Sequence, residues 1–229
     1  MLLRSVISVF FLAASSLAVA DYYPSTATYE VTITNITRGQ TFTPQLVVAH
    51  SRKVQLFDLG EPASDELATL AESGNTQPLT DVLLNAGNKV GEVKTVDGLL
   101  LPGKSVTTTI TTNPRKQFFI SLAAMLIPTN DTFVSLNKVR LPFYGKKTVM
   151  ALAYDAGSEL NDQNCLNIPG PRCGGAGDSA PADTDEGYVY VSNGFHELGS
   201  VDAAGNEILG PAVYDWRNPV AKVTIRRVY

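Results

Sequence analysis

The feature that most constrains the fold is a pair of apolar runs that each end at a short acidic turn. The first run, 118–126, is almost continuously apolar, which is typical of a central strand that is buried on both faces. The turn after it contains Asp131. The second run, 147–154, is followed at once by Asp155 and then Glu159. A strand buried on both faces needs neighbours in a sheet and a layer over each side, so these runs predict a layered β-fold with acidic loops at its strand ends.

Alternation of apolar and polar residues predicts further strands on both sides of these runs. Between residues 26 and 34, Tyr29, Val31 and Ile33 alternate with polar residues, as in a half-buried strand. Short runs separated by turns are typical of an antiparallel β-sandwich, and we therefore predict an all-β fold of this type. The segments expected as strands are 26–34, 42–50, 105–112, 118–126, 133–141, 147–154, 188–191 and 220–228.

One short section has helical character, which predicts a helical insertion in the sandwich. The segment 62–72 begins with proline and acidic residues, and its apolar side chains recur at the spacing of one helical face. Gly74 supplies a natural end. A second short helix is expected over 78–84, with Thr76 as its N-terminal cap. Both helices are expected to pack against the sheet.

The first twenty residues have the features of a signal peptide. Arg4 supplies a positive charge, 6–17 form a short apolar segment, and Ala18-Val19-Ala20 resembles a cleavage site. This apolar run is too short to span a bilayer, and no later run reaches the length of a membrane span. We therefore expect cleavage near Ala20, export to the periplasm, the cell surface or the medium, and one folded domain over 21–229.

Charge and cysteine content limit the partners and the compartment. The formal net charge is −4, which argues against non-specific nucleic-acid binding because that relies on basic surfaces. Cys165 and Cys173 are the only cysteines, and in an exported protein a pair this close is expected to form a disulfide. A zinc site is less favoured, because two cysteines without nearby histidines supply too few ligands.

A long irregular segment, 160–187, contains both cysteines, several prolines and glycines, and many acids. A loop of this length in a compact domain is usually functional or disordered. Its acids allow a second, weaker cation site, although an acidic solvated loop is the commoner explanation. The acids concerned are Asp178, Asp183, Asp185 and Glu186, with Asp162 nearer the cysteines.

The three carboxylates Asp131, Asp155 and Glu159 are the best candidates for binding chemistry. Calcium binds several oxygens at once, and carboxylates placed together without a cation raise one another's pKa values. Remaining ligands would come from backbone carbonyls, Asn130, Asn161 or water. The alternative is three unrelated, solvated acids, which is common for acidic turns.

Catalytic motifs are not evident. His196-Glu197 opens like a zinc-protease motif, but Ser200 stands where the second histidine would be needed. There is no nucleophile elbow or phosphate-binding loop, and His50 is the only other candidate base. Hydrolysis by a pair of carboxylates remains open on residue types alone. We do not expect an enzyme.

Four segments, taken in order, resemble the spondin domain known from the N-terminal region of F-spondin, and in particular its secreted bacterial members. They are Asn35-Ile-Thr-Arg-Gly-Gln-Thr-Phe-Thr-Pro44, Leu56-Phe-Asp-Leu-Gly-Glu-Pro-Ala-Ser64, Asp131-Thr-Phe-Val134 after Pro-Thr-Asn, and Tyr154-Asp-Ala-Gly-Ser-Glu159. The resemblance covers essentially the whole chain after the signal peptide. It implies a C2-like antiparallel β-sandwich that binds calcium in loops at one end.

In that family pattern, Asp131 and Asp155 match the first two ligands, and Glu159 stands where a third aspartate is usual. The extra methylene of glutamate is compatible with calcium. The expected function is that of an exported calcium-binding module that attaches to a cell surface, matrix or membrane. A lipid phosphate, an acidic glycan or a carboxylate of a partner protein would complete the coordination. The alternatives are a domain in which calcium is purely stabilising and, less favoured, a carboxylate-based hydrolase.

Overall fold

The computed structural model describes residues 25–174 and 186–228, and the expected signal peptide lies outside these ranges. Ten strands form one antiparallel hydrogen-bonded sheet, whose main path runs β4-β3-β6-β7-β8-β12-β1-β5. The two short strands β2 and β9 pair with β6 and β8. Strands of the sheet are β1 (Ala27–Asn35), β2 (Thr41–Phe42), β3 (Gln45–His50), β4 (Val90–Val96), β5 (Ser105–Thr112), β6 (Phe119–Ile127), β7 (Thr132–Arg140), β8 (Lys146–Asp155), β9 (Tyr190–Val191) and β12 (Ala221–Arg227).

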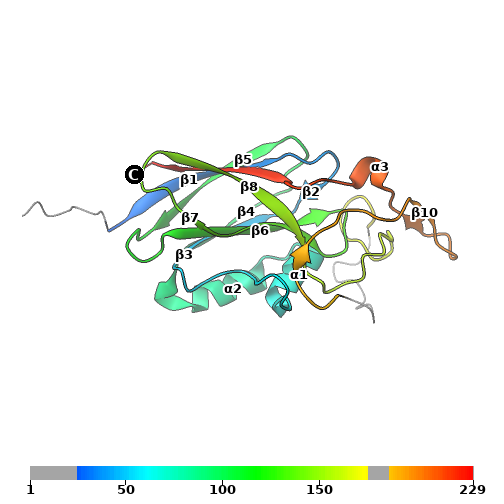
Figure 1. Cartoon of the computed structure of the whole chain (residues 1–229), viewed down its shortest axis with the longest axis horizontal. Coiled ribbons are helices and arrows are strands. Elements are labelled where there is room, and N and C mark those ends of the chain that lie inside the picture. The colour runs from blue at the N-terminus through cyan, green and yellow to red at the C-terminus, as the bar shows by residue number, and fades with distance from the viewer. Residues whose placement is uncertain (1–24, 175–185, 229) are drawn as a thin grey trace, which may run out of the picture.

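The sheet folds over on itself into a two-layered sandwich (Figure 1). Its two end strands, β4 and β5, approach one another: the Thr111 N–H donates to Glu92 Oε2 at 2.5 Å, and Lys94 Nζ donates to the Thr109 carbonyl at 3.4 Å. The all-β sandwich predicted from the sequence is therefore confirmed.

The alternation in β1 explains how the layers meet. Tyr29, Val31 and Ile33 are buried in the main core, while the intervening Thr28 and Thr32 form hydroxyl contacts with Thr111 and Thr107 of β5. Strand pairing of β1 with both β12 and β5 keeps these apolar side chains on one face. The same face collects inward residues of the opposite layer, such as Leu122 and Val134, into one core.

Strand β6 is buried on both faces, as its apolar run predicts. Ile120, Leu122, Ala124 and Leu126 belong to the core between the layers. Ala123, one residue out of step with these, belongs to a second core that lies under the helices. Since both faces are covered, an uninterrupted apolar sequence is what this position requires.

The helical insertion consists of α1 (Asp65–Ser73) and α2 (Gln77–Asn85), followed by the short helix η1 (Gly87–Lys89). Ser64 caps α1, because its hydroxyl accepts from the Leu67 N–H at 3.3 Å, and Gly74 ends it in the left-handed conformation. Their buried faces, formed by Leu67, Leu70, Ala71, Leu79 and Leu83, pack against β4, β6 and β7, and the same hydrophobic cluster includes residues of β3.

The expected cap of α2 differs in detail. Thr76 occupies the cap position, but its side chain makes no capping hydrogen bond. Its hydroxyl instead bonds to the Thr95 hydroxyl of β4 at 3.1 Å, and Asn75 Oδ1 accepts from the Gln77 N–H at 3.0 Å. Contact with the sheet therefore takes the place of capping at this position.

The chain after residue 196 forms a small hairpin and a short helix at one end of the sandwich (Figure 1). These elements are β10 (Ser200–Val201), β11 (Glu207–Ile208) and α3 (Pro211–Tyr214). Within the described ranges, no helix has the length and apolar character needed to cross a membrane.

Candidate functional site

The two acidic turns meet at one end of the sandwich. Asp131 lies directly before β7, Asp155 is the last residue of β8, and these two strands pair with Thr132 opposite Asp155. Antiparallel pairing of β6, β7 and β8 thus brings the turn after β6 beside the turn after β8. All three predicted ligands, Asp131, Asp155 and Glu159, are buried, with 0–2% of their surface exposed.

Asp131 organises the second turn through one of its two carboxylate oxygens. Its Oδ2 atom accepts from the backbone N–H groups of Ser158 at 2.8 Å and Glu159 at 3.1 Å, and from the Ser158 hydroxyl at 3.3 Å. The Asp131 backbone carbonyl also accepts from the Ala156 N–H at 3.2 Å. The first turn therefore fixes the conformation of the second.

Asp155 is held within its own turn. Its Oδ1 atom accepts from the Gly157 N–H and its Oδ2 atom from Asn161 Nδ2, both at 3.0 Å. Gly157 has a positive φ of 65°, and a Cβ atom there would lie 2.3 Å from the Tyr188 carbonyl oxygen. The Asp-Ala-Gly sequence is thus explained, because only glycine fits this turn.

The carboxyl groups of Asp131 and Asp155 lie within hydrogen-bonding reach of one another. Burial raises the pKa of Asp131 well above its ordinary value, the charge of Asp155 adds to this, and the N–H groups of Ser158 and Glu159 oppose it. Burial likewise raises the pKa of Asp155, against the hydrogen bonds from Asn161 and Gly157. When both carboxylates are ionised they repel one another, and a proton or a cation between them would relieve this repulsion.

Asp131 Oδ1 is the atom that most clearly lacks a partner. It is buried, and no hydrogen-bond donor reaches it from the described part of the chain. Buried carboxylate oxygens are normally hydrogen-bonded or bound to a metal. This oxygen and the neighbouring Asp155 carboxylate form a donor set that fits a hard, oxygen-binding cation.

Glu159 stands in the same turn but does not complete a three-carboxylate cluster as the side chains lie. Among the described residues, no group of three or more His, Cys, Asp or Glu side chains is arranged to hold a metal ion. The arrangement therefore consists of a close aspartate pair, with the Glu159 carboxylate buried in the adjoining turn.

One further residue, Tyr190, belongs to this site and was not expected from the sequence. Tyr190 of β9 lies opposite Asp155, and its hydroxyl accepts from Asn161 Nδ2 at 3.2 Å and donates to Glu186 at 3.1 Å. Burial, and then the negative charges of Asp155 and Glu186, raise the pKa of Tyr190. Nothing in the local pattern signals this role, because the pairing of β9 with β8 joins segments on either side of the long loop.

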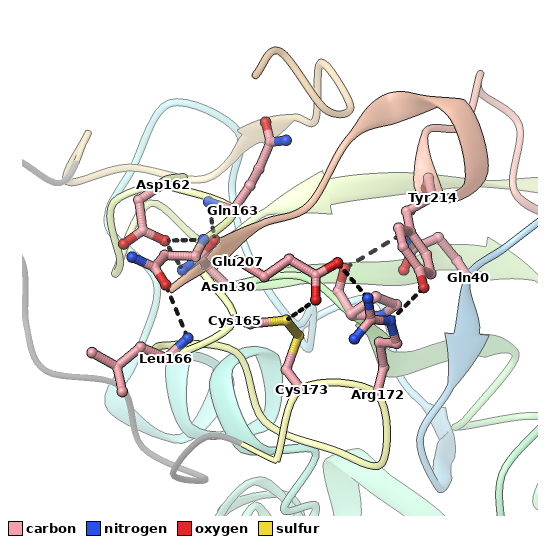
Figure 2. The surroundings of a disulfide bond; sticks show 12 residues. Gln40, Asn130, Asp162, Gln163, Cys165, Leu166, Arg172, Cys173, Glu207 and Tyr214 are labelled. Atoms are coloured by element: carbon pink, nitrogen blue, oxygen red, sulfur yellow. Dashed lines mark hydrogen bonds and ion pairs between the residues drawn. A yellow bond between two sulfur atoms is a disulfide. The ribbon is translucent and has the colours of Figure 1, made fainter. Parts of the chain in front are cut away.

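The first part of the long loop is fastened to the first acidic turn (Figure 2). Asn130 Nδ2 donates to Asp162 Oδ1 at 3.0 Å, and the Gln163 N–H donates to Asn130 Oδ1 at 3.3 Å. The Gln163 side chain in turn accepts from the N–H groups of His196 and Glu197, both at 2.8 Å. The loop after Glu159 is thus an integral part of the end of the sandwich.

Cys165 and Cys173 form the expected disulfide (Figure 2). Between them, Arg172 forms an ion pair with Glu207 of the β10–β11 hairpin, and its Nε donates to the Tyr214 hydroxyl at 2.6 Å. The Cys165 N–H donates to the Glu207 carbonyl at 2.8 Å. Both ends of the disulfide loop are therefore held against the hairpin and α3.

The other candidate residues do not join the aspartate pair. His50 is buried and bonds to the Ser121 hydroxyl and the Ser51 carbonyl, both at 2.8 Å, which is a structural role. His196 is exposed beside Glu197, at 3.7 Å. The possible second cation site formed by Asp178, Asp183 and Asp185 lies outside the described residues, and Glu186 points to Tyr190 instead.

A cleft of about 260 Å³ opens beside the second acidic turn. It is lined by Leu160, Asn161, Asp162, His196, Glu197 and Ile208. Asn161 connects it to the site, because its side chain donates to Asp155. Only the Asn161 side chain would separate a ligand in this part of the cleft from Asp155.

Comparison with curated proteins gives no match. The model of the Spondin_N family matches residues 23–162, a segment that includes both acidic turns and all three predicted ligands. Domains of this family are extracellular, β-rich and of a non-enzymatic type, in agreement with the sandwich and the disulfide. The match covers more than half of the chain, and the chain therefore belongs to the Spondin_N family.

Proposed function

We propose that this protein is an exported, non-catalytic attachment module that binds calcium at the end of its sandwich. Asp131 and Asp155 are the primary ligands, and Glu159, buried in the adjoining turn, would become the third carboxylate ligand only after a change in its side-chain conformation. The remaining positions would be filled by backbone carbonyls, by the Asn161 carboxamide oxygen, by water, or by an acidic group of a surface ligand.

The observation that carries the proposal is the contact between the Asp131 and Asp155 carboxyl groups. It is buried, one oxygen of Asp131 has no donor among the described residues, and the pKa values of both groups are raised. A calcium ion between the two carboxylates would replace their mutual repulsion with one favourable bond to each of them. Chelation at a strand-end loop also leaves part of the ion accessible to an outside ligand.

The ion is expected to attach the protein to acidic groups at a cell surface, matrix or membrane. The cleft lined in part by Leu160, Asn161 and Ile208 gives such a ligand a partly apolar surface next to the ion. A phosphate, a uronic acid or a carboxylate entering there would satisfy the calcium while its scaffold contacts the cleft. Calcium would then act as the bridge.

Calcium titration by calorimetry tests the ion, using the chain that begins at Asp21. The wild type is expected to bind one ion, and Asp155→Ala is expected to lose that binding. Asp81→Asn removes one negative charge from α2, on another part of the molecule, and is expected to bind as the wild type does. An absence of binding by the wild type, or unchanged binding by Asp155→Ala, would overturn the metal assignment.

Attachment is tested separately, by screening an array of acidic glycans and anionic vesicles with calcium and with EDTA. Calcium-dependent capture that is lost in Asp155→Ala supports the proposal. Calcium binding that raises the melting temperature without any calcium-dependent capture would show that the ion is purely stabilising. Turnover in a hydrolase substrate panel would contradict the non-catalytic part of the proposal.

A further inference from the structure

Positively charged side chains gather at the end of the sandwich opposite the aspartate pair. Strands β6 and β8 each run from this end, at Phe119 and Lys146, to the acidic turns. The loops 113–118 and 141–145 and the end of β12 therefore lie together here, near the C-terminus in Figure 1. Exposed cationic residues in these segments and the flanking strand ends are Arg115, Lys116, Arg140, Lys146, Lys147 and Arg226.

Few negative charges balance this end. The described segments 113–118, 140–147 and 226–228 contain no Asp or Glu. Glu30, which lies opposite Arg226 in the β1–β12 pairing, forms an ion pair with it at 3.0 Å. In a chain with a net charge of −4, this concentration of cations makes the molecule electrically polarised, with its basic end away from its acidic site.

A cleft of about 280 Å³ lies within this basic end. Arg115 from one loop and Arg140 from the neighbouring strand end both line it, together with Phe118, Pro142 and Phe143. The Arg140 guanidinium lies over the Phe118 ring, 5.8 Å from its centre. Two guanidinium groups beside apolar walls suit a phosphate group that carries an apolar neighbour.

Two aromatic side chains protrude from the same end. Phe143 and Tyr144 form the tip of the loop between β7 and β8, and 56% and 83% of their surfaces are exposed. Adjacent large aromatic residues at a loop tip leave apolar surface in water unless a partner covers it. The Arg227 guanidinium lies 5.4 Å from the centre of the Phe143 ring, so positive charge accompanies the apolar tip.

We infer that this end docks on an anionic lipid surface, independently of calcium. Headgroup phosphates would enter the cleft between Arg115 and Arg140, Phe143 and Tyr144 would enter the interfacial layer, and the surrounding lysines would interact with further headgroups. Aromatic side chains favour the interface between headgroups and acyl chains, and each Lys or Arg near an anionic leaflet adds to the electrostatic attraction.

Side-chain chemistry favours lipid over an acidic polysaccharide. Sugar hydroxyls are normally bound by amides and carboxylates, but neither type of side chain lines the cleft that contains Arg115 and Arg140. The apolar tip, in contrast, is of little use to a highly hydrated chain. With this end on a membrane, the aspartate pair at the other end would face outward, where it could bind a second partner.

Co-sedimentation with vesicles tests the inference, in EDTA and with the chain that begins at Asp21. Binding is expected to vesicles that contain phosphatidylglycerol at about 30% in phosphatidylcholine, and not to phosphatidylcholine alone. Lys146→Glu/Lys147→Glu is expected to weaken binding by at least about tenfold. The control Lys104→Glu/Lys222→Glu makes the same change of charge at exposed sites elsewhere and is expected to bind nearly as the wild type does.

The apolar contribution is tested by Phe143→Ser/Tyr144→Ser, which keeps every charge and is expected to weaken vesicle binding while leaving the melting temperature nearly unchanged. Asp131→Asn is expected to bind vesicles in EDTA as the wild type does, which separates this surface from the calcium site. Equal binding to neutral vesicles, or equal loss in the control and the Lys146/Lys147 variant, would overturn the inference. Binding to heparin but not to anionic vesicles would do so too and would assign the surface to acidic polysaccharide.

Discussion

The buried carboxyl group of Asp131 lies against that of Asp155, and its Oδ1 atom receives no hydrogen bond from the described residues. Its other oxygen accepts from the N–H groups of Ser158 and Glu159. One carboxylate thus serves two purposes. Its Oδ2 atom holds the turn that follows Asp155, and its Oδ1 atom is the oxygen on which the proposed calcium site depends.

Replacing Asp131 by Asn is expected to stabilise the protein in EDTA and to abolish stabilisation by calcium. The Asn oxygen can accept from the Ser158 and Glu159 N–H groups, while its NH2 group can donate to Asp155. The gain in the free energy of unfolding should be on the order of 1 kcal/mol, because a buried like-charge contact becomes a hydrogen bond. Urea unfolding with EDTA and with calcium measures both effects.

In the wild type, calcium at about one hundred times its dissociation constant should add about 2.7 kcal/mol to the free energy of unfolding. Asp81→Asn, in α2, is the control for loss of one negative charge and should retain this gain. If Asp131→Asn destabilises the protein in EDTA, then the Asp131–Asp155 contact is not a source of repulsion in the fold.

The sandwich and the place of the acidic turns could be predicted from the sequence, because burial of one or both faces of a strand determines the pattern of its apolar residues. Strand β6, which is buried on both faces, has a continuous apolar run, and β1, which is buried on one face, alternates apolar and polar residues. The position of Asp131 beside Asp155 follows from the antiparallel neighbours β7 and β8, which are consecutive in the chain. Local sequence pattern and the short connection between β7 and β8 are therefore sufficient to predict these features.

Long-range and weakly patterned features could not be predicted. A strand over 188–191 is predicted, but its pairing with β8 across the long loop, which brings Tyr190 to Asp155, has no signal in the local sequence. The β10–β11 hairpin is short, and α3 has only four residues. The Thr76 side chain bonds to Thr95 of β4, a tertiary contact that competes with the local capping preference.

Gly157→Ala is expected to disrupt the second acidic turn. The added Cβ would meet the Tyr188 carbonyl oxygen at 2.3 Å in a backbone conformation that disfavours side chains. Gly87→Ala is the matched control, since Gly87 has a similar φ of 61° and a Cβ added there would meet nothing within 4 Å. The control should lose about 1 kcal/mol, from backbone strain alone, and Gly157→Ala about 2 kcal/mol or more.

Calorimetry then distinguishes the two glycine variants by calcium affinity. Gly157→Ala displaces the N–H group that donates to Asp155, so the calcium affinity of this variant should fall. Gly87→Ala should bind calcium as the wild type does. Equal losses of stability in the two variants would mean that the turn relaxes around the new methyl group.

Removal of the disulfide by Cys165→Ser/Cys173→Ser is expected to lower the free energy of unfolding by about 2–3 kcal/mol. The bond closes a loop with a sequence separation of 8, and the estimate is the entropy that a loop of this size loses in the unfolded chain. Denaturant unfolding measures the loss. Because Arg172, Glu207 and Tyr214 also hold this loop, the variant should remain folded and keep most of its calcium affinity.

His50 is expected to make stability fall on mild acidification. Burial lowers the pKa of His50 below its ordinary value of 6.5, and the nearby positive charge of Lys138 acts in the same direction. The unfolded state therefore takes up a proton at a higher pH than the folded state does. This contribution to stability is complete above about pH 6.5 and is lost as the pH falls from there toward the lowered folded-state value.

His50→Gln removes this titration while leaving a side chain that can bond to the Ser121 hydroxyl, which lies 2.8 Å from the His50 ring in the wild type. The variant is expected to be less stable than the wild type at pH 7.5, and the difference should shrink between about pH 6.5 and pH 5. Urea unfolding across this range, with both proteins in EDTA, gives the difference directly. Because Asp131 and Asp155 are present in both proteins, their own titration cancels. A difference that stays constant with pH would show that the proton affinity of His50 is the same in the folded and unfolded states.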